Sequence, residues 1–206
     1  MTAAELLSGH NVSRETLGRL EKYEVLLRKW NPTINLVSRS TLDQVWQRHF
    51  VDSAQIFDLA DSNANHWADL GAGGGFPGLI VAILAADRKR ALDVTLVESD
   101  QRKAAFLMTA AREIGVTTRT VVDRIEMIPP LHADILSARA LAPLDKLLEF
   151  AERHLRPGGQ ALFPKGASYA DEVRQALEKW RFSYEAIPSV TDDSAVILSI
   201  RDIERV

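Results

Sequence analysis

The feature that most constrains this chain is a glycine-rich segment, HWADLGAGGGFPGLI, at residues 66–80. A short apolar run ends at Asp69, and Gly71, Gly73 and Gly75 follow in a D-x-G-x-G-x-G pattern. Glycine lets the backbone turn sharply, and its missing Cβ lets a ligand approach the chain closely. The segment therefore predicts a strand, a nucleotide-cofactor loop and a helix in succession, with an ordinary tight turn as the alternative.

Two classes of cofactor fit this loop. The glycines also satisfy G-x-G-x-x-G at Gly73, Gly75 and Gly78, the pattern for a dinucleotide whose pyrophosphate sits at a helix N-terminus. S-adenosylmethionine has no phosphate and carries an ammonium and a sulfonium instead, so an acid such as Asp69 at the strand end suits it. Glu98 ends a second apolar run about 20 residues later. In both cofactor classes an acid at this place accepts hydrogen bonds from the ribose hydroxyls. The residues favour the methyl donor and leave the dinucleotide open.

Strand-like runs continue to alternate with helical patterns along the chain. Beyond residues 66–70 and 93–99, further strands are expected near residues 118–122, 132–139, 160–163, 182–187 and 195–201. Such alternation predicts an α/β protein with a mostly parallel sheet covered by helices on both faces.

The first 60 residues predict a helical N-terminal extension, and residues 61–206 the cofactor-binding α/β core, within one domain of 206 residues. Ser13 is a helix cap, and the apolar spacing carries that helix to about Trp30, where Asn31 and Pro32 are expected to stop it. A second helix is expected over residues 41–59, and most apolar side chains in it are core by default.

Composition narrows the class of protein without choosing a function. The chain has no cysteine, which excludes disulfides, thiolate nucleophiles and cysteine-ligated zinc, and we expect no metal site. It carries 25 basic and 28 acidic residues, so any surface that binds RNA phosphates must be assembled locally in space. No run of 18 apolar residues and no leader pattern occurs, so we expect a soluble cytoplasmic protein that avoids membranes. We also expect a monomer that does not bind DNA.

Five segments in a fixed order resemble one known family. They are residues 69–78 (DLGAGGGFPG), 48–53 (RHFVDS), 35–38 (NLVS), 137–140 (SARA) and 162–166 (LFPKG). Together they resemble the RsmG (GidB) family of small-subunit ribosomal RNA methyltransferases over nearly the whole chain. The resemblance implies a class I, Rossmann-like methyltransferase fold with a seven-stranded sheet. It also implies S-adenosylmethionine as donor, 16S rRNA or the small ribosomal subunit as partner, and methylation of guanine N7 in the decoding-centre loop.

The resemblance and the positions of residues at strand ends give a set of candidate site residues. Those expected to bind the cofactor are Asp69, Gly71, Gly73, Gly75, Phe76, Glu98, Ile125, Glu126 and Arg139. Those considered for positioning the reactants are Arg139, Lys165, His49 and Asp52, and no residue is assigned as catalytic with certainty.

Each candidate also has an ordinary structural interpretation. Arg139 could form a surface ion pair with Asp134 or Asp145, and His49 with Asp52 could be a structural pair one helical turn apart. Phe76 could plug the core, Glu126 could be a solvated acid at a helix start, and Lys165 could be solvated or contact an RNA phosphate.

The sequence also bears on the chemistry. Guanine N7 has an in-plane lone pair and no proton, so the enzyme mainly has to orient the two reactants, which can supply roughly 7 to 11 kcal/mol. A cysteine nucleophile for pyrimidine C5 is missing, and Ser137-Ala-Arg-Ala140 stands where exocyclic-amine methyltransferases carry an Asn/Asp-Pro-Pro-Tyr/Phe motif. A methyltransferase for another RNA or a small molecule, and a dinucleotide-dependent oxidoreductase or binding module, remain as alternatives.

Overall fold

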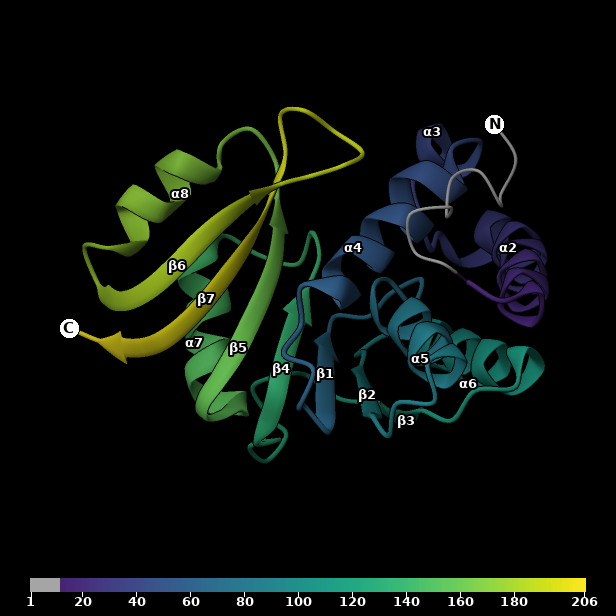
Figure 1. Cartoon of the computed structure of the whole chain (residues 1–206), viewed down its shortest axis with the longest axis horizontal. Coiled ribbons are helices and arrows are strands. Elements are labelled where there is room, and N and C mark those ends of the chain that lie inside the picture. The colour runs from purple at the N-terminus through teal and green to yellow at the C-terminus, as the bar shows by residue number, and fades with distance from the viewer. Residues whose placement is uncertain (1–11) are drawn as a thin grey trace.

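A computed structural model describes residues 12–206 as a seven-stranded sheet with helices on both faces (Figure 1). The strand order is β3-β2-β1-β4-β5-β7-β6. The strands are β1 (His66–Leu70), β2 (Asp93–Val97), β3 (Arg119–Val121), β4 (Ala133–Ala138), β5 (Leu155–Lys165), β6 (Trp180–Pro188) and β7 (Val196–Arg205). The first five run parallel, whereas β7 lies antiparallel between β5 and β6, which confirms the mostly parallel α/β sheet.

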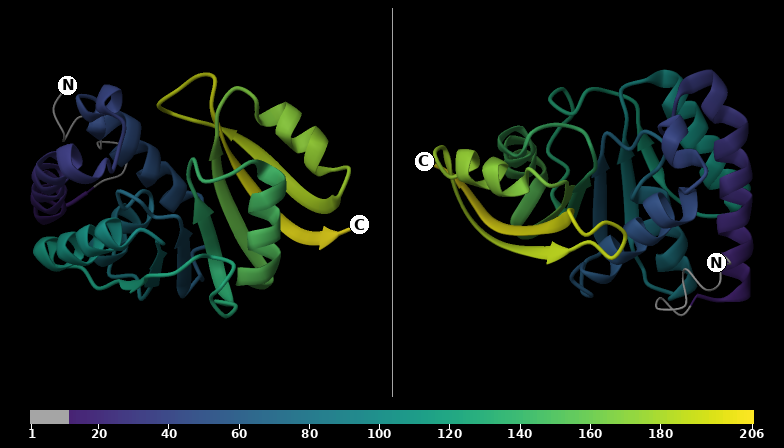
Figure 2. Two further views of the ribbon diagram at one scale, coloured as in Figure 1. Left: turned by 180° about the vertical axis from the view of Figure 1, so that it is seen from behind. Right: turned by 90° about the horizontal axis from the view of Figure 1, so that it is seen from above.

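Side chains of successive strand residues enter two separate hydrophobic cores. Ile135 and Leu162 belong to one core, and their neighbours Leu136 and Phe163 belong to the other. Because successive strand residues point to opposite faces, this division shows that both faces of the sheet are buried. The first core holds α5 (Gly78–Asp87) and α6 (Gln101–Ile114), and the second holds α7 (Leu144–His154) and α8 (Tyr169–Ala176) (Figure 2).

The N-terminal helices share the first of these cores. They are α2 (Arg14–Ile34), α3 (Arg39–Leu42), a π-helical turn η2 (Trp46–Val51) and α4 (Asp52–Asp58). Ser13 caps α2 as expected, by accepting a hydrogen bond from the Thr16 amide at 3.2 Å. Leu20, Tyr23 and Leu27 of α2 are fully buried in the core that α5 and α6 also line. The expected N-terminal segment of residues 1–11 lies outside the described residues.

Two expectations about these helices were wrong. Helix α2 continues through Asn31 and Pro32 to Ile34, because the side-chain oxygen of Asn31 accepts hydrogen bonds from the amides of Leu36 and Val37 and so closes the helix end. Pro32 lies within the last turn of the helix, where it removes one backbone donor. The expected helix over residues 41–59 is interrupted by a turn after α3, and its middle part is the π turn η2, which runs directly into α4; His49 and Asp52 line one cavity.

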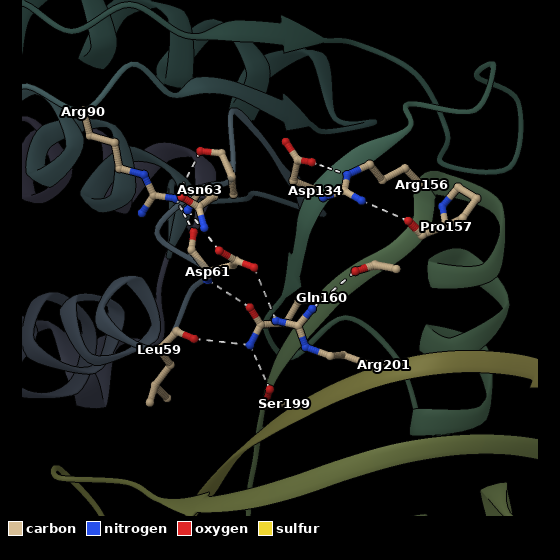
Figure 3. A network of polar contacts seen from close by, with 12 residues as sticks. Leu59, Asp61, Asn63, Arg90, Asp134, Arg156, Pro157, Gln160, Ser199 and Arg201 are labelled. Atoms are coloured by element: carbon tan, nitrogen blue, oxygen red, sulfur yellow. Dashed lines mark hydrogen bonds and ion pairs between the residues drawn. The ribbon is translucent and has the colours of Figure 1, made fainter.

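A polar network closes the amino ends of the strands (Figure 3). Asp134 at the start of β4 accepts hydrogen bonds from the amides of Asn65 and His66, at 2.8 and 2.9 Å, and from Arg156. Gln160 of β5 donates to Leu59 O at 3.2 Å and to Ser199 Oγ at 2.9 Å. These bonds tie the connection from α4 to β1 onto the centre of the sheet. Among residues 12–206, no helix is long and apolar enough to cross a membrane.

Candidate functional site

The glycine-rich loop lies between β1 and α5, at the carboxyl end of the sheet. Gly71, Gly73 and Gly75 all have positive φ, at 65°, 52° and 92°, which explains why glycine is needed at each. A Cβ on Gly75 would lie 2.5 Å from the Tyr23 hydroxyl, so packing fixes this glycine. A Cβ on Gly73 would meet only Gly71 O, at 3.7 Å, so this position is open. The loop therefore has one face packed on α2 and another free for a ligand.

A cavity of about 520 Å³ opens on that free face of the loop. It is lined by most of the residues that the sequence proposed for the cofactor: Gly71, Gly73, Glu98, Ile125, Glu126 and Arg139. The Glu98 carboxylate accepts hydrogen bonds from the Gly73 amide at 2.9 Å and from the Asp100 amide at 2.8 Å. Its remaining lone pairs are free for further donors. A carboxylate beside an open glycine loop fits the ribose of a nucleoside cofactor, and the cavity size is typical of small-molecule sites.

Asp69 lies beneath the loop and does not line this cavity. The carboxylate is fully buried and accepts hydrogen bonds from Ser137 Oγ at 2.8 Å and from the Gly78 amide at 3.0 Å. Burial raises the pKa of Asp69 to about 7. In this geometry Asp69 joins β4 to the first turn of α5, and its contact with a methionine ammonium stays a prediction.

Arg139 is the centre of a buried cluster at the end of β4. Its guanidinium lies 5.0 Å above the ring of Phe76, donates to His49 Nδ1 at 2.6 Å and to Arg48 O at 3.3 Å, and is 4.0 Å from Asp52. The alternative of a surface pair with Asp134 or Asp145 is wrong, because those acids pair with Arg156 and Lys179. The cluster holds Arg139 at the boundary between the cofactor cavity and the space beyond it.

Phe76 and His49 form the floor of this cluster. Phe76 is 3% exposed, packs between Tyr23 and His49, and lines neither cavity, as its core-plug interpretation expects. The Nδ1 atom of His49 accepts from Arg139, so its proton lies on Nε2, which is 2.9 Å from the Thr41 hydroxyl. Burial, followed by the charge of Arg139, lowers the pKa of His49 to about 3. His49 is therefore a neutral side chain with both ring nitrogens occupied.

A second cavity, of about 710 Å³, adjoins the first at Arg139. Residues 139–142 line both cavities and form the wall that they share. Ala140 in this wall has φ of 51°, a left-handed conformation that is uncommon for alanine and concentrates at functional sites. Ligands bound in the two cavities would thus contact the same four residues.

Lys165 reaches this second cavity but is already paired. Its ammonium donates to Glu172 at 2.7 Å and to Ala142 O at 3.1 Å, and its side chain is 9% exposed. These bonds attach the end of β5 to α8 and to the shared wall. A role in binding an RNA phosphate stays a prediction, because the ammonium would have to serve the phosphate alongside Glu172.

Several residues of the two cavities were not found from the sequence. In the cofactor cavity they include Lys103, Arg124 and Lys146, and in the second cavity Thr41, Ser189, Thr191 and Asp192. Asp192 pairs with Arg48 at 2.9 Å across 144 positions of the chain. No local pattern marks such residues, since the fold brings their loops together. Among residues 12–206, no group of three or more His, Cys, Asp or Glu is arranged to hold a metal ion.

Comparison with known proteins gives the family. A family model described as "rRNA small subunit methyltransferase G" matches residues 16–197. The chain belongs to this family. The ribosomal RNA small subunit methyltransferase G of Ruegeria pomeroyi is 55% identical over 95% of this chain and 96% of that protein. That of Rhodospirillum centenum is 51% identical over 98% of this chain and 91% of that protein. The chain is accordingly an S-adenosylmethionine-dependent rRNA methyltransferase.

Solved structures support the same fold class at low sequence identity. The ribosomal protein L11 methylase of Lactobacillus delbrueckii subsp. bulgaricus superposes with a TM-score of 0.59 at 18% identity, covering 74% of this chain and 77% of that one. The M. jannaschii TYW2 in complex with AdoMet gives a TM-score of 0.55 at 12% identity, covering 83% and 78%. The glycine loop, Glu98 and the adjoining cavity of this chain fit the methyl donor, which confirms the cofactor expected from the sequence.

Proposed function

We propose that this methyltransferase transfers a methyl group from S-adenosylmethionine to N7 of one guanine in the decoding-centre loop of 16S rRNA. The observation that carries this proposal is the pair of cavities that share residues 139–142. The donor cavity lies over the glycine loop, and the second cavity is large enough to accept a base rotated out of its stack. A reaction that needs only orientation is well served by two such neighbouring sites.

The side chains around the shared wall support N7 as the nucleophile. Bound S-adenosylmethionine supplies an electrophilic methyl group, and N7 attacks it with a lone pair and loses no proton. Within residues 12–206, His49 is the only histidine that lines either cavity, and its Nδ1 lone pair is taken by Arg139. Among the described residues no imidazole is thus arranged as a general base, as an N7 reaction permits.

The roles of individual residues follow from this proposal. Glu98 would hold the ribose, Ile125 and Glu126 the adenine side of the donor cavity, and Gly71 and Gly73 would let the donor approach the backbone. Arg139 would bind the methionine carboxylate, since its remaining N–H groups lie at the wall that both cavities share. Asp69, Gly75 and Phe76 would act indirectly, by supporting the loop.

The wider setting is also a proposal. We infer that the enzyme acts in the cytoplasm as a monomer on the small subunit or its rRNA, and that DNA and membranes are not its targets. Arg48, Arg124 and Lys146 at the cavity rims would supply local positive charge for RNA phosphates on a chain of net charge −3. The N-terminal helices, residues 12–60, would belong to the substrate side, because η2 and α4 line the second cavity.

The product identifies the nucleophile. N7-methylguanine carries a fixed positive charge, and treatment with borohydride and aniline cleaves the RNA chain at that position. We expect 16S rRNA from cells that contain the enzyme to show one such cleavage in the decoding-centre loop, and rRNA from cells without it to show none. Nucleoside mass spectrometry would assign the methylated atom. A methyl group on an exocyclic amine, a ribose or a pyrimidine carbon would refute the N7 proposal.

A further inference from the structure

The second cavity contains three carboxylates, which differ in how many hydrogen bonds they already accept. They are Asp52, Glu172 and Asp192. Glu172 accepts from Lys165 at 2.7 Å, the Leu144 amide at 2.9 Å and Ser168 Oγ at 3.5 Å. Asp192 accepts from Arg48 at 2.9 Å and from the amide and hydroxyl of Ser194 at 3.0 and 2.7 Å. Both groups are thus held by charged and backbone donors within the protein.

Asp52 is largely shielded from solvent, yet its hydrogen-bond partners are much weaker. Its side chain is 14% exposed, Oδ1 accepts from Thr191 Oγ1 at a long 3.3 Å, and Ser189 adds a second hydroxyl. Oδ2 has an ion pair with Arg139 at 4.0 Å, beyond hydrogen-bond distance. Burial raises the pKa of Asp52, and the charge of Arg139 offsets part of that effect. A buried carboxylate with spare acceptor capacity that faces a cavity is a group arranged for a ligand donor.

The ligand chemistry that fits such a carboxylate is the Watson–Crick edge of guanine. That edge presents two neighbouring donors, N1–H and the N2 amino group, which the two oxygens of one carboxylate can accept together. Adenine presents an acceptor at N1, which a carboxylate would repel. N7 belongs to the other ring of the base and stays free when the Watson–Crick edge is bound, so recognition and methylation use different edges.

We infer that the Asp52 carboxylate selects the target base, by accepting hydrogen bonds from N1–H and the N2 amino group of a guanine bound in the second cavity. This inference rests on the proposed function and adds to it the residue that sets base specificity. The π turn η2 ends directly before Asp52, and Asp52 and His49 line the same cavity, next to the shared wall. Asp52 acts in this scheme on substrate selection and exchanges no proton with the reacting atoms.

The test compares Asp52→Asn with the wild type on two substrates. Small subunits would be reconstituted with 16S rRNA that carries either guanosine or inosine at the target position, since inosine keeps N1–H, O6 and N7 but lacks the N2 amino group. For the wild type we expect kcat/KM on inosine to fall on the order of 10-fold, as for one hydrogen bond to a charged acceptor. For Asp52→Asn we expect kcat/KM on guanosine to fall on the order of 10- to 100-fold. The ratio of kcat/KM on guanosine to kcat/KM on inosine should then approach one.

The ratio separates recognition from a merely structural effect. Any difference in N7 reactivity between the two bases is the same for both proteins and cancels in the comparison. Asp192→Asn is the matched control, because it changes another carboxylate of the same cavity, and we expect it to keep the wild-type ratio. Equal affinity for S-adenosylhomocysteine in Asp52→Asn and wild type would show that the fold and the donor cavity are intact, and Asp52→Ala provides a second variant.

Two results would overturn the inference. The first is a ratio of kcat/KM on guanosine to kcat/KM on inosine that is the same in Asp52→Asn, Asp52→Ala and the wild type. The second is a wild-type enzyme that methylates both bases with equal kcat/KM. A wild-type enzyme that leaves N7 of guanosine unmethylated would instead refute the proposed function itself. The wild-type reaction on guanosine thus distinguishes failure of the function from failure of the Asp52 assignment.

Discussion

The two ends of the sheet both carry polar networks, but their side chains are in opposite electrostatic states. At the amino end, burial acts to raise the pKa of Asp134, yet hydrogen bonds from two backbone amides and from Arg156, whose contact Figure 3 shows, hold that pKa below its usual value. At the carboxyl end, burial prevails: the pKa values of Asp52 and Asp69 are raised and that of His49 is lowered. Asp134 thus accepts three strong hydrogen bonds, whereas Asp52 at the carboxyl end is desolvated and keeps spare acceptor capacity.

This difference separates a structural network from a functional site. Carboxylates that accept from backbone amides and arginines stabilise the folded state in their ionised form. Buried ionisable groups with incomplete partners cost stability, and they are typical of sites where a ligand completes the set of contacts. The comparison predicts that substitutions at the carboxyl end change ligand binding, whereas those at the amino end change stability.

The largest effect is expected for Gly73→Val. The valine side chain would enter the donor cavity, because a Cβ on Gly73 meets only Gly71 O at 3.7 Å. We expect affinity for S-adenosylhomocysteine, measured by calorimetry, to fall on the order of 100-fold or more, since the space that the ligand needs is filled. The left-handed backbone at φ of 52° adds a strain of roughly 1 to 2 kcal/mol.

Gly115→Val is the matched control for that strain. Gly115 caps α6 with φ of 71°, a Cβ added there would have no other atom within 4 Å, and the residue lines neither cavity. The same substitution should therefore lower the free energy of unfolding by a similar amount and leave cofactor affinity unchanged. Wild-type affinity in a folded Gly73→Val protein would reject the assigned loop.

The second prediction contrasts one arginine from each end of the sheet. Arg139→Ala removes the guanidinium at the shared wall, and we expect affinity for S-adenosylhomocysteine without RNA to fall on the order of 10- to 100-fold, as for a charged hydrogen bond. Arg156→Ala removes the partner of Asp134 and should leave that affinity unchanged. If Arg139 contacts an RNA phosphate instead, cofactor affinity will stay at the wild-type value and the salt dependence of rRNA binding will decrease.

The sequence predicted the sheet and the donor loop because their signals are local. Apolar runs that end in Asp69 and Glu98, and glycines at positions of positive φ, are visible within short windows. The sequence analysis missed the π turn, since no residue pattern in this segment marks where i→i+5 hydrogen bonds replace the i→i+4 bonds of an α-helix. The sequence analysis also placed the end of α2 too early, because the Asn31 side chain accepts the hydrogen bonds of the Leu36 and Val37 amides that follow the helix.

The second cavity could be predicted only in part. His49, Asp52, Arg139 and Lys165 were candidates because they lie in motifs or at strand ends, and the fold brings all four to one cavity. Their partners could not be read from the chain, since Thr191 reaches Asp52 across 139 positions. The pKa shift of His49 likewise depends on burial and on Arg139, which only the folded structure provides.

The third prediction concerns stability at the amino end. Asp134→Ala leaves the amides of Asn65 and His66 and the Arg156 side chain without their acceptor. We expect the free energy of unfolding in urea at pH 7 to fall by about 1 to 3 kcal/mol, with unchanged affinity for S-adenosylhomocysteine. Because the folded pKa is lowered, this contribution is present above the unfolded pKa of about 3.9 and is lost as pH falls through the folded pKa. The difference between variant and wild type should therefore shrink as pH falls below about 3.9, and a constant difference would argue against an ionic role.

The smallest expected effect is the absence of a histidine titration at the carboxyl end. His49 accepts from Arg139 at Nδ1 and lies 2.9 Å from Thr41 at Nε2, and its pKa is lowered to about 3. Its imidazole nitrogen signals, assigned by comparison with His49→Gln, should stay constant from pH 5 to 8 in NMR spectra. Since an unfolded histidine binds a proton near pH 6.5, keeping His49 neutral costs the folded protein stability progressively as pH falls below that value. A titration midpoint between pH 5 and 8 would show that Arg139 does not occupy Nδ1, and would reopen general-base chemistry at the shared wall.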